Sequence, residues 1–168
     1  MKISIVYHSE SGNTKTVADI IAKGILSIDG IEVKPMPITN IDEDFLSQSV
    51  AIVFGSPTYA GTFSYQMKKW MDTVSLKRFE GKLGAVFATE NYLGGGADVA
   101  LMGMVGHLLI GGMLIYSGGA AHGHPYTHFG AVCIRNGDEF QQQRALIFGE
   151  KIGKKAKELF GHNKHTSS

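Results

Sequence analysis

Apolar residues occur along the chain in two patterns, short unbroken runs and longer stretches in which they recur every three or four residues. The runs at 3–6, 31–34, 50–54, 83–88 and 113–116 predict five strands. The stretches between these runs predict helices. Because strands and helices alternate throughout, we expect an α/β fold with a parallel, doubly wound sheet.

Each helix is predicted from the apolar stripe that it would turn toward the sheet. The stripe of the first helix is Val17, Ile20, Ile21, Gly24 and Ile25. The stripe of the next is Met67, Trp70, Met71 and Val74. A further helix is expected over 97–109, and a last one begins at Asp138. The core stripe of that last helix is Ala145, Phe148, Ile152, Ala156 and Leu159.

One long connection interrupts this alternation. Residues 118–137 are rich in glycine and histidine and contain a single short apolar run at 131–134. Connections of this length in compact domains are usually functional or cover an interface. Cys133 lies in the apolar run, where we expect a small buried hydrophobic residue rather than a redox thiol.

Length and composition fit one domain, at 1–161, followed by a flexible tail at 162–168. The 168 residues are 43% hydrophobic and carry a net charge of +1, so we do not expect a nucleic acid as partner. No apolar stretch is long enough to span a bilayer, and the first residues lack the pattern of a signal peptide. We therefore expect a cytoplasmic protein that has no membrane partner.

The most informative segment lies between the first strand and the first helix, and reads Ser9-Glu10-Ser11-Gly12-Asn13-Thr14. Free N–H groups and the dipole at a helix start favour an anion. Hydroxyl groups add donors, and Gly12 permits a close approach. The segment lacks both the Gly-Lys-Ser/Thr of a nucleoside-triphosphate loop and the three glycines of a dinucleotide fingerprint. It therefore predicts a site for a phosphate monoester, and an ordinary helix cap is the alternative.

Two more loops follow predicted strands. The loop at 55–61 contains Tyr59, and the loop at 89–96 contains Tyr92 and three consecutive glycines. In an open parallel sheet such loops meet at the carboxyl ends of the strands, where ligands bind. We expect the two tyrosines to stack on a flat aromatic ligand while backbone amides bind its polar edge. The alternative is that both are ordinary half-exposed loop residues.

Together the three loops resemble those of the flavodoxin-like FMN proteins. They are most similar to the NAD(P)H:quinone oxidoreductases of the tryptophan-repressor-binding-protein family and to the NADPH-dependent FMN reductases. Residues 123–126 also resemble that family's Gly-Gly-x-Pro-Tyr loop. The resemblance implies a flavodoxin-like three-layer, doubly wound sandwich with a five-stranded parallel sheet in the order 2-1-3-4-5.

The resemblance also implies FMN as the cofactor and a homodimer or homotetramer with flavin sites near subunit contacts. The phosphate of FMN would bind to Ser9, Ser11, Gly12, Asn13 and Thr14. The ring would be flanked by Pro57, Thr58, Tyr59, Ala60, Gly61, Thr89, Glu90, Asn91, Tyr92, Gly94, Gly95 and Gly96. Glu90-Asn91 stands where the family usually has Gly-Thr, and we expect Glu90 to face away from the ring, because its charge would disfavour the reduced, anionic flavin.

On this basis we expect an FMN-dependent NAD(P)H oxidoreductase of the quinone or flavin reductase type. FMN would perform the chemistry, so no catalytic side chain is assigned. The partners would be NAD(P)H and a quinone-like or flavin acceptor, with Tyr126 and His128 as candidates on the substrate side. His122, His124 and His128 crowd one loop but lack a fourth ligand, so no metal is predicted.

Two other functions are compatible with the same loops. The first is a flavodoxin-type electron carrier that has no small-molecule substrate of its own. Such carriers are strongly acidic, which suits docking on basic partners, and the net charge of +1 weighs against this alternative. The second is a non-redox module that binds FMN and interacts with other proteins.

Overall fold

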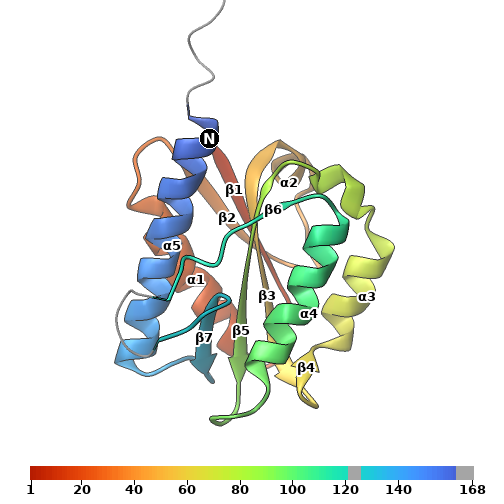
Figure 1. Cartoon of the computed structure of the whole chain (residues 1–168), viewed down its shortest axis with the longest axis vertical. Coiled ribbons are helices and arrows are strands. Elements are labelled where there is room, and N and C mark those ends of the chain that lie inside the picture. Colours follow the sequence, from red (N-terminus) through yellow and green to blue (C-terminus); the bar gives the residue numbers. More distant parts are fainter. Residues whose placement is uncertain (121–125, 162–168) are drawn as a thin grey trace, which may run out of the picture.

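The computed structural model describes residues 1–120 and 126–161, so the predicted tail at 162–168 lies outside the described residues. A mainly parallel sheet lies between two layers of helices (Figure 1). Its first four parallel strands are β1 (Lys2–Tyr7), β2 (Glu32–Pro37), β3 (Ser49–Tyr59) and β5 (Leu83–Glu90). They lie in the order β2-β1-β3-β5, which confirms the predicted doubly wound α/β class.

The fifth position of the sheet is shared by two short strands. β6 (Leu114–Ile115) pairs with one end of β5, and β7 (Ala131–Ile134) pairs with the other end. The sequence predicted a strand at 113–116 and none at 131–134, so the predicted order holds with this difference in detail. A Cβ on Gly130 would lie 2.0 Å from the Val86 carbonyl oxygen, so glycine is what lets the chain return this closely to β5.

Helices cover both faces of the sheet (Figure 1). One face carries α1 (Asn13–Leu26) and α5 (Glu139–Phe160). The other carries α2 (Glu43–Gln48), α3 (Tyr65–Thr73) and α4 (Ala97–Ile110), with the 3₁₀ turn η1 (Leu76–Phe79) between α3 and β5. Each face buries its own apolar cluster, and no helix within 1–120 or 126–161 is long and apolar enough to cross a membrane.

The predicted stripes face the sheet, with one exception. Leu159 was expected in the core but is 45% exposed, so that prediction is wrong. Ala156 is the last fully buried member of the stripe, and Phe160, one turn later, packs against the core in place of Leu159.

Contact between α1 and α5 fixes the position of the helix that follows the predicted phosphate loop. A Cβ on Gly24 would lie 2.1 Å from the Leu146 carbonyl oxygen, and a Cβ on Gly149 would lie 2.1 Å from the Ile21 carbonyl oxygen. The two backbones therefore meet without intervening side chains. This close contact packs the C-terminal half of α1 against α5, while its first turn lies at the edge of the sheet.

Candidate functional site

The three predicted loops meet at the carboxyl edge of the sheet. β1, β3, β5 and β7 all end at this edge, which is at the bottom of Figure 1. The hairpin formed by β3 and β4 (Thr62–Phe63) lies at the same edge, next to the start of α4. Parallel pairing thus brings together segments that lie far apart in the sequence, as the sequence predicted.

The start of α1 keeps backbone donors available. Gly12 is the N-cap residue, with φ +88°, and no side chain caps the helix from that position. The Lys15 N–H donates to Ser9 Oγ at 3.3 Å and the Thr16 N–H donates to the Gly12 carbonyl oxygen at 2.9 Å. Within the described part of the chain, the N–H groups of Asn13 and Thr14 have no partner. Free N–H groups at the positive end of a helix are the donors that bind a phosphate.

Hydroxyl groups tie this loop to β5. Thr14 Oγ1 and Thr89 Oγ1 lie 2.8 Å apart in a buried hydrogen bond. Since each hydroxyl has one proton, the pair keeps one proton for a further acceptor. Asn13 Nδ2 donates to Ser11 Oγ at 3.2 Å and holds the turn of the loop.

A buried histidine connects the same loop to α3. His8 is 5% exposed, with Nδ1 2.9 Å from Ser64 Oγ and Nε2 3.0 Å from Glu10 Oε1. Gln66 Nε2 also donates to Glu10 Oε1, at 3.1 Å. These bonds position Glu10, to which the sequence alone assigns no role, at the mouth of the site.

The second loop is a tight hairpin. Thr58 pairs with Phe63 and Tyr59 with Thr62, around a turn in which Ala60 has φ +50° and Gly61 has φ +80°. Two successive positive φ values are typical of the turn that best joins two-residue hairpins. Thr58 Oγ1 is buried at the wall of the site and has no partner among the described residues, so its hydrogen-bonding capacity is unmet.

The third loop brings a buried carboxylate into the site. Glu90 is 8% exposed, and its Oε2 accepts a hydrogen bond at 3.1 Å from the N–H of Ala97, the first residue of α4. Its carbonyl oxygen accepts a hydrogen bond at 2.6 Å from the N–H of Arg135, just beyond β7. The third loop also touches the second, since a Cβ on Gly96 would lie 2.7 Å from Gly61 Cα.

Two adjoining cavities lie among these loops. The larger, here called the loop cavity, has a volume of about 360 Å³ and is lined by Glu10, Ser11, Asn13, Thr14, Pro57, Thr58, Tyr59, Thr89, Glu90, Asn91 and Arg135. The smaller, the rim cavity, has a volume of about 260 Å³ and is lined by Thr58, Tyr59, Ala60, Gly61, Glu90, Asn91, Tyr92 and Gly95. Burial, and then the charge of Glu10, raise the pKa of Tyr59 at their shared wall.

The structure thus brings most of the predicted residues to one place. Ser9 and Gly12 belong to the phosphate loop without lining either cavity, and Gly94 and Gly96 line a third cavity instead. Sequence reasoning missed Arg135, an arginine with φ +54° that lines the loop cavity. Treating the run at 131–134 as a strand would have found it, because the next residue would then lie at the carboxyl edge.

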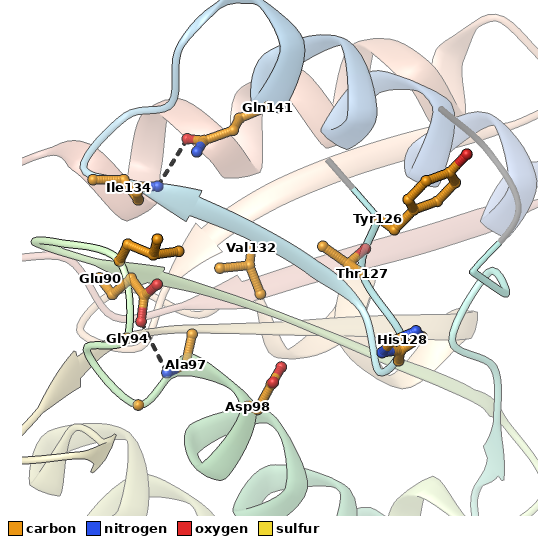
Figure 2. A pocket seen from close by; sticks show the side chains of 12 residues that line it. Glu90, Gly94, Ala97, Asp98, Tyr126, Thr127, His128, Val132, Ile134 and Gln141 are labelled. Atoms are coloured by element: carbon orange, nitrogen blue, oxygen red, sulfur yellow. Dashed lines mark hydrogen bonds between the residues drawn. The ribbon is translucent and has the colours of Figure 1, made fainter. Parts of the chain in front are cut away.

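The third cavity lies between α4 and β7, and we call it the β7 cavity (Figure 2). Its volume is about 430 Å³. It contains Tyr126 and His128, the two candidates for the substrate side, together with Glu90. His122 and His124 lie outside the described residues. Within 1–120 and 126–161, no three histidine, cysteine or acidic side chains gather as metal ligands would.

Comparison with known proteins agrees with this geometry. The profile of the Flavodoxin family matches residues 5–104, which include the phosphate loop, the hairpin and the third loop. The chain belongs to the flavodoxin family. Members of this family bind FMN, and FMN is the cofactor of this chain. The free N–H groups at α1 and the unmet Thr58 hydroxyl fit its phosphate and its polar ring.

Individual relatives extend the same assignment. A flavodoxin from Clostridium saccharobutylicum is 48% identical over 95% of this chain and 100% of its own. An NAD(P)H dehydrogenase (quinone) from Archaeoglobus fulgidus is 29% identical over 94% of this chain and 98% of its own. The flavodoxin, WrbA-like protein from Agrobacterium tumefaciens has the same fold, with a TM-score of 0.78 at 23% identity over 94% of this chain and 98% of that one. The predicted resemblance to flavodoxin-like FMN proteins is confirmed.

Proposed function

We propose that this flavodoxin-family chain is an electron-transfer protein whose FMN occupies the loop and rim cavities, with the phosphate at the start of α1. FMN supplies the redox chemistry when bound. The N–H groups of Asn13 and Thr14 hold the phosphate, and Tyr59 and Tyr92 flank the ring. The other predicted residues that line these two cavities keep the roles that the resemblance implied, whereas Gly94 and Gly96 line the neighbouring β7 cavity.

One observation favours electron transfer over turnover of a nicotinamide dinucleotide. Such a dinucleotide carries a pyrophosphate, which needs cations or a further set of free helix N–H groups. Among the described residues, Arg135 is the single lysine or arginine that lines any of the three cavities, whereas Glu10, Glu90 and Asp98 also line them. The cavities therefore suit one phosphate at α1 and disfavour a second polyanion.

The carboxyl edge of the sheet, where the three loops meet, suits the docking of a partner protein. Tyr92 is 68% exposed and Leu93 is 86% exposed, which gives an apolar rim beside acidic side chains. Part of the positive charge that offsets the acidic residues in the net charge comes from α5. It lies on the half of that helix that points away from this edge (Figure 1), at Lys151, Lys154, Lys155 and Lys157. The net charge of +1 therefore does not describe the docking edge, which suits a redox partner with a basic surface.

The identity of 48% with a protein named flavodoxin, over that protein's whole length, supports the same function. The sequence alone favours a quinone or flavin reductase over the electron carrier. The cavity charges and this relative support the reverse order.

A quinone or flavin reductase that uses NAD(P)H is the second candidate. The β7 cavity favours it, because a small-molecule substrate needs a concave site near the flavin and this one shares Glu90 with the loop and rim cavities. Tyr126 and His128 would then contact the substrate. The relative from Archaeoglobus fulgidus, named NAD(P)H dehydrogenase (quinone), supports this candidate at 29% identity.

Anaerobic reduction of the FMN-loaded protein separates the two candidates. A carrier is expected to accumulate the one-electron-reduced flavin during titration with dithionite, and to be reduced only slowly by NADH or NADPH. Rapid reduction by either nucleotide, followed by rapid reoxidation with a quinone, would overturn the carrier proposal in favour of the reductase. Failure to bind FMN would overturn both.

The predicted homodimer or homotetramer remains a proposal, and we propose the outer face of α4 as its contact surface. Its outward side chains include Val99, Met102, Leu109 and Ile110, which are between 46% and 84% exposed. An apolar outer face on a helix is a common site of subunit contact. Light scattering after size-exclusion chromatography measures the mass directly. The cytoplasmic location likewise stays a prediction.

A further inference from the structure

The β7 cavity has a composition unlike that of the cavities next to it. Its lining comes from the third loop, the start of α4, the segment 126–128, β7 and α5 (Figure 2). Leu93, Ala97, Val132 and Ile134 give it apolar walls. Its volume of about 430 Å³ lies within the range of small-molecule sites.

Acidic groups determine the charge of this cavity. Glu90 and Asp98 both line it, and no lysine or arginine does so among the residues that the structure describes. Asp98 has no hydrogen-bonding or ionic partner in the described ranges. Glu90 is more than nine-tenths buried, and among residues 1–120 and 126–161 one hydrogen bond reaches its carboxylate, from the Ala97 N–H. A buried carboxylate with a single neutral donor is costly, and a cation beside it would offset that cost.

Stabilisation of α4 accounts for part of this arrangement, because acidic groups near the first turn of a helix interact favourably with its dipole. It does not account for the open volume in front of both carboxylates or for the apolar walls opposite them. Figure 2 shows the Asp98 side chain pointing into this space, across from Thr127 and His128. A capping role alone needs no such cavity.

We propose that the β7 cavity is a second ligand site, for a small organic cation whose charged head binds Glu90 and Asp98 and whose apolar body lies against Val132 and Ile134. An amidinium or guanidinium head fits because it presents several N–H donors to carboxylate oxygens in one plane. Anions of the same shape are excluded by the two carboxylates. The proposal rests on the electron-transfer function, because under the reductase alternative the β7 cavity would hold the substrate itself.

Three probes of nearly identical shape test the charge selectivity: benzamidinium, benzamide and benzoate. Each is titrated into ¹⁵N-labelled, FMN-loaded protein, so that the flavin occupies its own cavities and the probes cannot enter them. Benzamidinium is expected to shift the amide signals of Val132, Ile134 and Gly94 and to bind about tenfold more tightly than benzamide. Benzoate is expected to give no shifts at these residues.

Two matched variants test the acidic group. Asp98 and Asp44 are both exposed and both occupy the second position of a helix, in α4 and α2 respectively. Asp98→Asn should remove most of the preference for benzamidinium over benzamide, whereas Asp44→Asn should leave it unchanged. The proposal is overturned if benzamidinium gives no shifts around β7, if benzoate binds equally well, or if both variants behave alike.

Discussion

Replacement of Gly96 by alanine tests the contact between the second and third loops. Gly96 has φ +101°, and a Cβ there would lie 2.7 Å from Gly61 Cα and 2.9 Å from the Gly61 carbonyl oxygen. Gly94 is the matched control, because it lies in the same loop with φ +79° but a Cβ there would meet nothing within 4 Å. Both variants impose a left-handed alanine, and only Gly96→Ala also forces the two loops apart.

The geometry sets the expected magnitudes. A left-handed alanine costs about 1–2 kcal/mol at either position. Overlap with a backbone adds about 1–3 kcal/mol at Gly96 alone, unless Gly61 moves. The pairing of Thr58 with Phe63 resists that movement by fixing the hairpin. If the hairpin does move, the strain appears instead as a loss of FMN affinity of about tenfold for each 1.4 kcal/mol.

Two assays distinguish these results. Urea denaturation of the apoprotein gives the free energy of unfolding, and quenching of FMN fluorescence gives the dissociation constant. Gly96→Ala should lose more than Gly94→Ala in the sum of the two effects, by at least about 1 kcal/mol. Equal losses in the two variants would refute the close approach of the loops and, with it, the geometry of the rim cavity.

Three further predictions concern single side chains. Thr89→Val leaves the buried Thr14 hydroxyl without its partner and should lower the free energy of unfolding by about 1–3 kcal/mol. The double variant Thr14→Val/Thr89→Val should recover part of that loss, and simple additivity of the two changes would contradict this. Burial, and then the charge of Asp138, raise the pKa of the Cys133 thiol to about 12. Ellman's reagent should therefore react with this thiol at pH 8 only after unfolding, and a fast reaction in the native state would count against the buried position. Arg135→Gln should lower the two-electron midpoint potential of bound FMN by about 30 mV, because it removes a positive charge from the wall of the loop cavity. A potentiometric titration measures this potential, and an unchanged or raised value would be inconsistent with that position of Arg135.

The parts of the fold that the sequence predicted are those with a local pattern. The segment that runs from β1 into α1 contains a strand, a hydroxyl-rich turn and a helix start within a dozen residues, and each of these has its own sequence signature. The central strands β3 and β5 are continuous and apolar, so their positions follow from burial on both faces. Once these strands are parallel, their loops must meet at one edge.

The parts that were missed depend on distant contacts. β7 has four residues, and its pairing partner on β5 lies more than 40 positions earlier, so its short apolar run was not assigned as a strand. Arg135 was missed with it, because only the pairing of β7 brings that residue to the loop cavity. β4 and α2 are too short for a periodic pattern, and Leu159 is exposed because the neighbouring Phe160 packs against the core at the end of α5.

The central claim is that free N–H groups at the start of α1 hold the phosphate of FMN. Titration of the apoprotein with FMN and with riboflavin, which lacks the phosphate, measures this contribution most directly by fluorescence quenching. Two or more charge-assisted hydrogen bonds predict that FMN binds at least about a hundredfold more tightly than riboflavin. Equal affinities for the two compounds would contradict the account, because the phosphate would then lie outside the loop at α1.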